Sequence, residues 1–223
     1  MRTTAILILI CGSVLLAQDR EIDPFADASN STLPAKASTP PKTEDLRPSA
    51  ADLKLLGEPS LEGRTDADRF PTIRVIWCRT FHPPVSLRAY LTKDGPRLRV
   101  ARMSGKGGYD WGTLDFENDF PLRAETWMRL LNLLNADGAR QPLKNVKQED
   151  MDYLTGLDGS TWKLEVSDQA GYTVDEVWTP MNVTNGDPDI KKLAEDQGIR
   201  LDNFVKLCSL LIQYAPIDPE SIY

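Results

Sequence analysis

The sequence predicts an α+β domain in which an antiparallel sheet carries two or three helices packed on one face. Two observations lead to this prediction. The elements follow one another as strands, helix, strands and helix, and turn residues join neighbouring strands. The helical segments are amphipathic, so each has an apolar stripe that can be buried against a sheet.

The predicted strands share an alternation of polarity and many β-branched and aromatic residues. They span 72–80, 85–92, 96–103, 113–116, 161–166 and 172–179. Asp94-Gly95, between the second and third segments, is typical of a tight hairpin turn. The last two segments form a second predicted hairpin, which turns across 167–171.

Two longer helices are predicted over 124–136 and 201–214, because their large apolar residues fall on one stripe. Asp137-Gly138 ends the first of them. A short helix lies between the second hairpin and the last helix. Asp187 is its expected N-cap, and Pro188 is its expected first residue.

Residues 1–17 predict a secretory signal peptide. A positive charge and an apolar core over 5–16 precede Ala17, so that cleavage leaves Gln18 as the first residue. The apolar run is shorter than a membrane span requires. Lipidation at Cys11 is the competing interpretation, and we disfavour it because a bulky residue precedes the cysteine. The protein is therefore expected to be exported, to the periplasm or beyond the cell.

Residues 18–70 predict a proline-rich flexible linker. Most of them are small, polar or proline, so the stretch has too little apolar surface to offset the entropy lost on ordering. One short helix is expected within it over 50–56, capped by Ser49 and ended by Gly57, as a candidate arm that docks on the domain. The globular domain is then 71–223.

Composition excludes some function classes. With 26% charged and 41% hydrophobic residues, the chain is an ordinary globular protein. A net charge of −7 argues against nucleic-acid binding, which needs a basic excess. No segment after the signal is long and apolar enough to span a membrane.

Two cysteines remain after cleavage, Cys78 and Cys208. We expect buried thiols rather than a bridge, because Cys208 lies on the apolar stripe of its helix. With a single histidine in the chain, these residues are too few for a zinc site. No metal ion and no other cofactor is expected.

Four blocks stand out along the domain. They are RTFHPP at 79–84, a loop with Gly-Gly-Tyr at 105–112, GLDGSTW at 156–162, and the segment 172–180. Their order and spacing resemble a family of uncharacterised exported bacterial proteins of one domain, over roughly residues 70–215. The resemblance implies a bacterial envelope or secreted location, and it implies no particular activity.

His82 is the candidate general base, because the pKa of a histidine lies near neutrality. With Asp158 or Glu176 it would make the protein an envelope hydrolase. In the competing interpretation, the imidazole holds the turn before Pro83-Pro84 by hydrogen bonds. We favour the structural interpretation, because no serine or cysteine motif accompanies the histidine. Whether the protein is an enzyme stays open at this point.

Two further patterns have a functional and a structural interpretation. The loop over 104–108 is rich in glycine like a phosphate-binding loop, but its spacing is wrong and no helix follows directly, so we interpret its glycines as turn residues. Four tryptophans lie on or beside predicted strands, at 77, 111, 162 and 178. A row of them on one face would stack on a sugar or peptide, whereas core packing is the interpretation that we favour.

Charge is distributed unevenly. Residues 71–106 contain eight basic residues and one acidic residue, whereas residues 107–223 contain 21 acidic and 10 basic ones. Strand alternation, with pairing in sequence order, puts several arginines on one outer face. The candidate ligand-binding residues are Arg74, Arg88, Arg97 and Arg99.

Two outcomes are possible for this basic face. Either side chains from the acidic second half neutralise it, or part of it stays open and binds an anionic envelope component or an acidic protein. The second outcome leads to the predicted function, a non-enzymatic binding or scaffold domain at the cell envelope.

Overall fold

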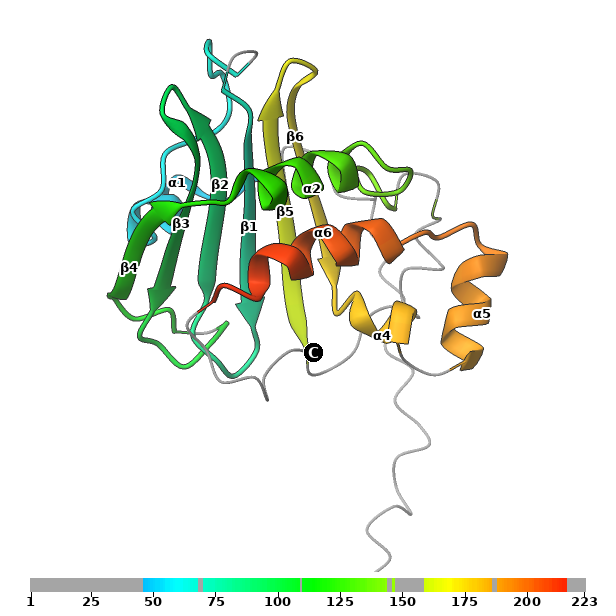
Figure 1. Cartoon of the computed structure of the whole chain (residues 1–223). Helices are drawn as coiled ribbons and strands as arrows, with labels where there is room; N and C mark the ends of the chain where they lie inside the picture. Colours follow the sequence, from blue (N-terminus) through cyan, green and yellow to red (C-terminus); the bar gives the residue numbers. More distant parts are fainter. Residues whose placement is uncertain are drawn as a thin grey trace, which may run out of the picture. The chain divides into compact units, whose positions relative to one another are not determined.

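Six strands form one open antiparallel sheet in the order β4-β3-β2-β1-β5-β6 (Figure 1). The structure is a computed structural model that describes residues 46–67, 70–108, 110–143, 146, 159–185 and 188–215. All of these residues belong to one compact unit. The predicted signal peptide and residues 18–45 of the predicted linker lie outside the described residues, as do Asp158 and the predicted N-cap Asp187.

The strands are β1 (Thr72–Arg79), β2 (Val85–Thr92), β3 (Gly95–Met103), β4 (Leu114–Pro121), β5 (Ser160–Asp168) and β6 (Gly171–Trp178). The helices are α1 (Ala50–Leu55), α2 (Ala124–Leu134), α4 (Met181–Asn185), α5 (Pro188–Asp196) and α6 (Asp202–Ile212). The predicted α+β class is confirmed. Two differences stand out: β4 is longer than the predicted segment over 113–116, and α4 was not predicted.

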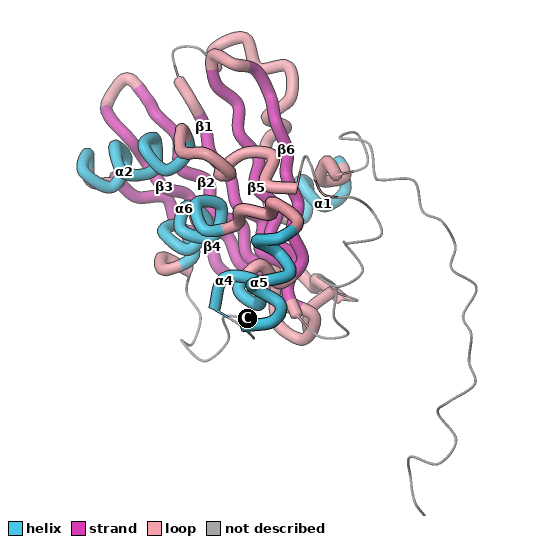
Figure 2. The backbone as a smooth tube through the Cα atoms, turned by 90° about the vertical axis from the view of Figure 1, so that its right-hand side faces the viewer, coloured by secondary structure: helices cyan, strands magenta, loops and turns pink. Residues whose placement is uncertain are grey.

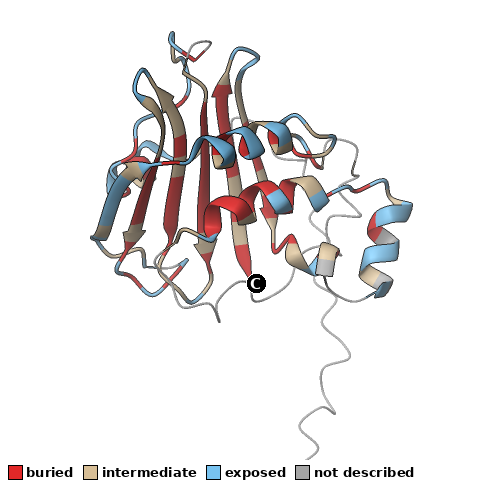
Figure 3. Cartoon of the chain, in the orientation of Figure 1, coloured by how far each residue is buried: buried red, intermediate tan, exposed pale blue. Residues whose placement is uncertain are grey.

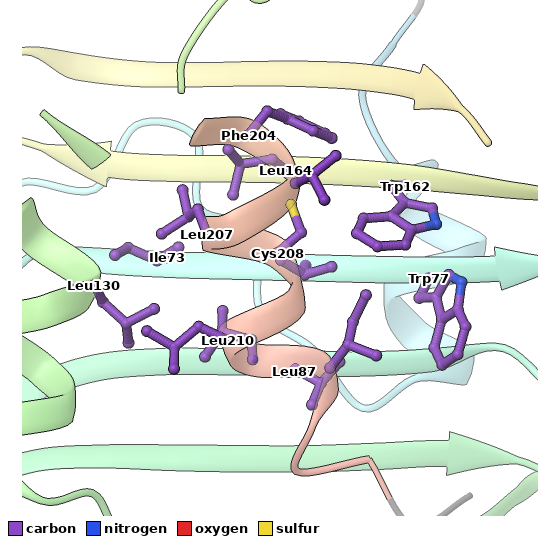
Figure 4. Packing of buried hydrophobic residues seen from close by; sticks show 14 of the residues in the cluster. Ile73, Trp77, Leu87, Leu130, Trp162, Leu164, Phe204, Leu207, Cys208 and Leu210 are labelled. Atoms are coloured by element: carbon purple, nitrogen blue, oxygen red, sulfur yellow. The ribbon is translucent and has the colours of Figure 1, made fainter. Parts of the chain in front are cut away.

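Helices α2 and α6 lie across one face of the sheet, as predicted (Figure 1). Alternate strand residues point into the core between the sheet and these helices, and α6 contributes Phe204, Leu207 and Cys208 to it (Figure 4). Trp77 and Trp162 lie side by side in this core, with ring centroids 6.4 Å apart and an interplanar angle of 68°. The core interpretation is therefore confirmed for these two tryptophans.

Helix α1 packs on the opposite face of the sheet (Figure 2). Ser49 accepts a hydrogen bond from the backbone of Asp52, whose side chain accepts one from the backbone of Ser49, and this reciprocal pair starts the helix. Leu53 and Leu56 are buried beside Ile76 of β1. The predicted short helix and its docking on the domain are thus confirmed. We call residues 46–61 the arm.

Burial differs across the sheet, because the central strands are covered on both faces and β4 is an edge strand that is largely exposed (Figure 3). Cys78 and Cys208 are free thiols, as predicted; Cys208 is buried, whereas Cys78 is only partly buried. Within the described residues, none of the helices combines the length and apolarity needed to cross a membrane.

The glycine-rich loop between β3 and β4 is a turn. Gly107 has a φ of +116°, and a Cβ there would overlap the backbone carbonyl oxygen of Thr80. Its glycine is therefore required by close backbone approach, and the element that follows the loop is a strand rather than a helix. The loop lacks the architecture of a phosphate-binding loop.

Candidate functional site

A row of charged residues crosses the sheet on the face that carries the arm. The strand register places Arg74 beside Arg88, and Arg88 beside Arg99. Glu165 of β5 and Asp119 of β4 are the next residues of the row on either side. Neighbouring like charges repel one another, so three adjacent arginines at largely buried positions need a counter-charge.

Glu58 of the arm supplies that charge. Its Oε2 accepts hydrogen bonds from Arg88 Nε at 2.6 Å and from Arg74 Nη1 at 3.3 Å. Its Oε1 accepts from Arg99 Nη1 at 2.5 Å and from Ser86 Oγ at 3.1 Å. The side chain of Glu58 is 0% exposed. We call its four donors, Arg74, Ser86, Arg88 and Arg99, the carboxylate seat.

The end of α1 aims Glu58 at the seat. The N–H of Gly57 donates to the carbonyl of Lys54 at 3.2 Å, and that of Glu58 donates to the carbonyl of Leu53 at 2.8 Å. This is a Schellman motif, which needs the positive φ of +63° that Gly57 adopts. A Cβ on Gly57 would also come within 2.8 Å of Arg99 Nη2, so glycine serves both the turn and the approach.

Two seat arginines have a second carboxylate partner. Arg74 Nε donates to Glu165 Oε2 at 2.6 Å, and Arg99 Nε donates to Glu117 Oε1 at 3.0 Å. Tyr172 donates to the other oxygen of Glu165 at 2.8 Å. Burial, followed by the charge of Glu165, raises the pKa of Tyr172, so the phenol keeps its proton as a donor.

The next row of residues on the same face contains Tyr90 and Arg97, and it lies at the rim of the seat. Arg97 donates to Asp119 at 2.6 Å, and the Arg97 side chain is 38% exposed. Tyr90 also donates to Asp119, and the Arg88 guanidinium lies 4.6 Å from the Tyr90 ring centroid. Arg97 therefore remains accessible, whereas the seat arginines lie inside.

Of the two outcomes left open for the basic face, neutralisation holds in its interior. Glu165 and Glu117, which pair with Arg74 and Arg99, come from the acidic second half, as that outcome requires. Asp119 of the same half pairs with Arg97 at the rim. Glu58 is not among the predicted site residues, because its segment has the composition of a linker. The one signal for it was Gly57, since a helix that ends at Gly57 puts Glu58 at a position that is usually apolar.

Two of the hydrolase candidates, His82 and Glu176, lie in different parts of the fold. Glu176 of β6 pairs with Lys163 at 2.9 Å, and the register puts Lys163 level with Ile76, before the end of β1. His82 lies in the loop beyond that end. Partial burial and then the charge of Arg79 lower the pKa of His82.

A hollow of about 810 Å³ opens elsewhere, between the C-terminal end of α2 and the β5–β6 turn. Arg140 and Asp168 form an ion pair in its wall. Neither His82, nor Glu176, nor any of the four candidate arginines lines it. Within the part of the chain that the structure describes, no group of three or more His, Cys, Asp or Glu side chains is placed to hold a metal ion.

In comparisons with known proteins, no protein-family model and no curated protein matches the chain. Its function is therefore inferred from the site itself.

Proposed function

We propose that this protein is an exported bacterial binding domain, without catalytic activity, that docks an acidic protein partner on its arginine-bearing sheet face at the cell envelope. One observation carries the proposal: this face already binds a carboxylate, that of Glu58, through three arginines and a serine. The planar guanidinium of arginine matches carboxylate geometry. The predicted signal peptide supports export, and the family resemblance supports a bacterial source.

The contacts around Glu58 favour a protein partner over an anionic lipid or polysaccharide. Arg74 Nη1 donates to the backbone carbonyl of Pro59 at 2.7 Å. Arg99 Nη2 donates to the backbone carbonyl of Leu56 at 2.9 Å. The same guanidinium groups thus bind a carboxylate and the peptide backbone on both sides of it, a combination that a polypeptide presents.

Arg97 gives the partner its first point of contact, because it is exposed and lies beside the seat. The test uses poly-L-glutamate as the probe and compares Arg97→Glu with Arg200→Glu. Arg200 is the matched control: it is 74% exposed and is also paired with one aspartate, Asp137. Both variants change the net charge equally, so a difference between them reports position.

We expect Arg97→Glu to weaken binding of poly-L-glutamate at least threefold more than Arg200→Glu does. Binding should also weaken as salt rises from 0.1 M to 1 M, since the Debye length falls from about 10 Å to about 3 Å. Equal affinities for the two variants would contradict the proposal. Binding to phosphatidylglycerol vesicles in place of poly-L-glutamate would also contradict it, and would assign the face to a lipid surface.

A further inference from the structure

Without Glu58, the three arginines of the carboxylate seat carry more positive charge than their other carboxylate partners neutralise. Arg74, Arg88 and Arg99 face two carboxylates that are almost fully buried, Glu58 and Glu165, while Glu117 is half exposed. If Glu58 leaves, three guanidinium groups share one buried carboxylate. Unpaired buried charge is unfavourable, so the vacated seat attracts another anion.

The arm that brings Glu58 is held by a small number of other contacts. Its buried apolar residues are Leu53 and Leu56, which meet Ile76 and Met103, and Leu61. The carbonyls of Leu56 and Pro59 accept hydrogen bonds from Arg99 and Arg74. The core beneath α2 and α6 is far larger, and no residue of the arm contributes to it. The arm also precedes β1 in the chain, so that it can leave the sheet without breaking any strand pairing.

From these observations we propose that the seat is a recognition site for a glutamate within an acidic peptide, and that the arm is its built-in competitor. Glu58 occupies the seat within the chain, and a glutamate of the partner replaces it when the partner binds. This inference rests on the proposed function and adds to it the ligand class and the regulation of the site.

The recognised unit follows from the contacts of the arm. It is a glutamate whose carboxylate meets three arginines and Ser86, and whose flanking backbone offers one carbonyl two residues before it and one just after it. A ligand that lacks the carboxylate keeps only the two carbonyl contacts. The seat therefore discriminates glutamate from glutamine, because glutamine replaces one of the two acceptor oxygens with an NH2 group, which only donates, at a place lined by donors.

The test uses the chain from Gln18 to its end with Glu58→Ala, which empties the seat. The probe is a peptide with the sequence of residues 49–61, and its matched control carries glutamine in place of the glutamate at position 58. We expect the Glu58→Ala protein to bind the glutamate peptide at least tenfold more tightly than the glutamine peptide. The wild-type protein, whose seat is filled, should bind the glutamate peptide at least tenfold more weakly than the variant does.

A folded Glu58→Ala protein that does not distinguish the two peptides would overturn the inference. Where this variant fails to fold, Glu58→Gln replaces it, and the melting temperature is measured in sodium acetate and in sodium chloride of equal ionic strength. A rise that is specific to acetate supports a seat that accepts a carboxylate in trans. Absence of that rise shows that the seat accepts none, and the inference is then wrong.

The two proposals fail in distinguishable ways. Peptide binding by the seat can be absent while Arg97→Glu still weakens binding of poly-L-glutamate, and then the docking function stands without the competing arm. Conversely, the seat can bind the peptide while Arg97→Glu and Arg200→Glu behave alike. In that case the seat accepts a glutamate in trans, but docking of an acidic partner through Arg97, and with it the proposed function, is wrong.

Discussion

The two faces of this sheet are built from the same strands but held by different forces. In β1, Ile73, Val75 and Trp77 point toward α2 and α6, where the contacts are apolar. Arg74, between them in sequence, points the other way and meets Glu58 and Glu165. Period-two alternation therefore lets one strand serve an apolar core and an ionic cluster at once.

The difference shows where stability and where specificity reside. Apolar burial is non-directional and favourable for any well-filled shape. The face that α2 and α6 cover, here called the helix face, therefore supplies most of the stabilising free energy. A buried ion cluster costs desolvation and is neutral or weakly favourable as a whole, although it is strongly unfavourable when one partner is removed. The opposite face, which carries the arm and is here called the arm face, therefore selects one particular group, the carboxylate of Glu58, at one particular place.

The largest effect is expected from Glu58→Ala. It leaves buried guanidinium groups without their shared partner, and it should lower the free energy of unfolding by about 3–5 kcal/mol. Glu62→Ala is the matched control within the N-terminal region, because Glu62 pairs with Arg47 but is 50% exposed, which predicts a loss of about 0–1 kcal/mol. Urea denaturation measures both. Similar losses for the two variants would mean that disrupting the buried ionic cluster lowers the free energy of unfolding no more than disrupting an exposed ion pair does.

A comparable loss of stability, with a different cause, is expected when a buried leucine on the helix face is shortened. Leu207 is fully buried in α6, and Leu207→Ala should lower the free energy of unfolding by about 3 kcal/mol, through lost burial and the cavity that remains. Acetate should leave this variant unchanged while it stabilises Glu58→Ala. Stabilisation of both variants by acetate would show that the effect is a general one of the salt.

The rim of the arm face should contribute little to stability. Arg97→Ala removes an exposed pair with Asp119 and should lower the melting temperature only slightly, with the loss shrinking further in 1 M salt. Thermal unfolding at low salt and in 1 M salt checks this. A loss as large as that of Leu207→Ala that persists in high salt would place Arg97 inside the cluster rather than at its rim.

Asp175→Asn should change mainly the pH dependence of stability. Asp175 lies on the helix face and is 8% exposed; burial raises its pKa, against the opposing effects of the Gln141 backbone N–H and of Arg140. The folded state thus holds this proton to a higher pH than the unfolded chain does, and stability falls as pH rises through that window.

Asparagine cannot ionise, so the Asp175→Asn protein should gain stability relative to wild type as the pH rises from the ordinary pKa of an aspartate, about 3.9, toward neutrality. Urea denaturation across this range gives the two curves. Parallel curves would show that the carboxyl group of Asp175 is not protonated preferentially in the folded state.

Local sequence patterns predicted most of the fold. The Asp94-Gly95 turn, the alternating strands and the two amphipathic helices depend on neighbouring residues alone, and they lie where expected. β4 was predicted too short because Asn118 interrupts the apolar positions that Leu114, Phe116 and Phe120 occupy. Asp115, Glu117 and Asp119 alternate with these positions and pair with arginines of the sheet. Helix α4 has five residues, which is too short for a helical period to be recognised.

The candidate site was only half predictable. Alternation within strands put the arginines on one face, and their pairing in sequence order followed from the short turns. The occupant of the seat was not predictable, because Glu58 lies 16, 30 and 41 residues from Arg74, Arg88 and Arg99. No local pattern encodes contacts at such separations.

By itself, the sequence determined the order and type of the elements, since backbone propensity, turn chemistry and apolar periodicity act over a few residues. It also determined that α1 ends at Gly57, which sets the direction in which Glu58 leaves the helix. Only the tertiary structure decided that a segment with the composition of a linker lies on the sheet. The physical reason is that three like charges become neighbours only once the strands pair, and only then does a buried carboxylate become favourable at that place.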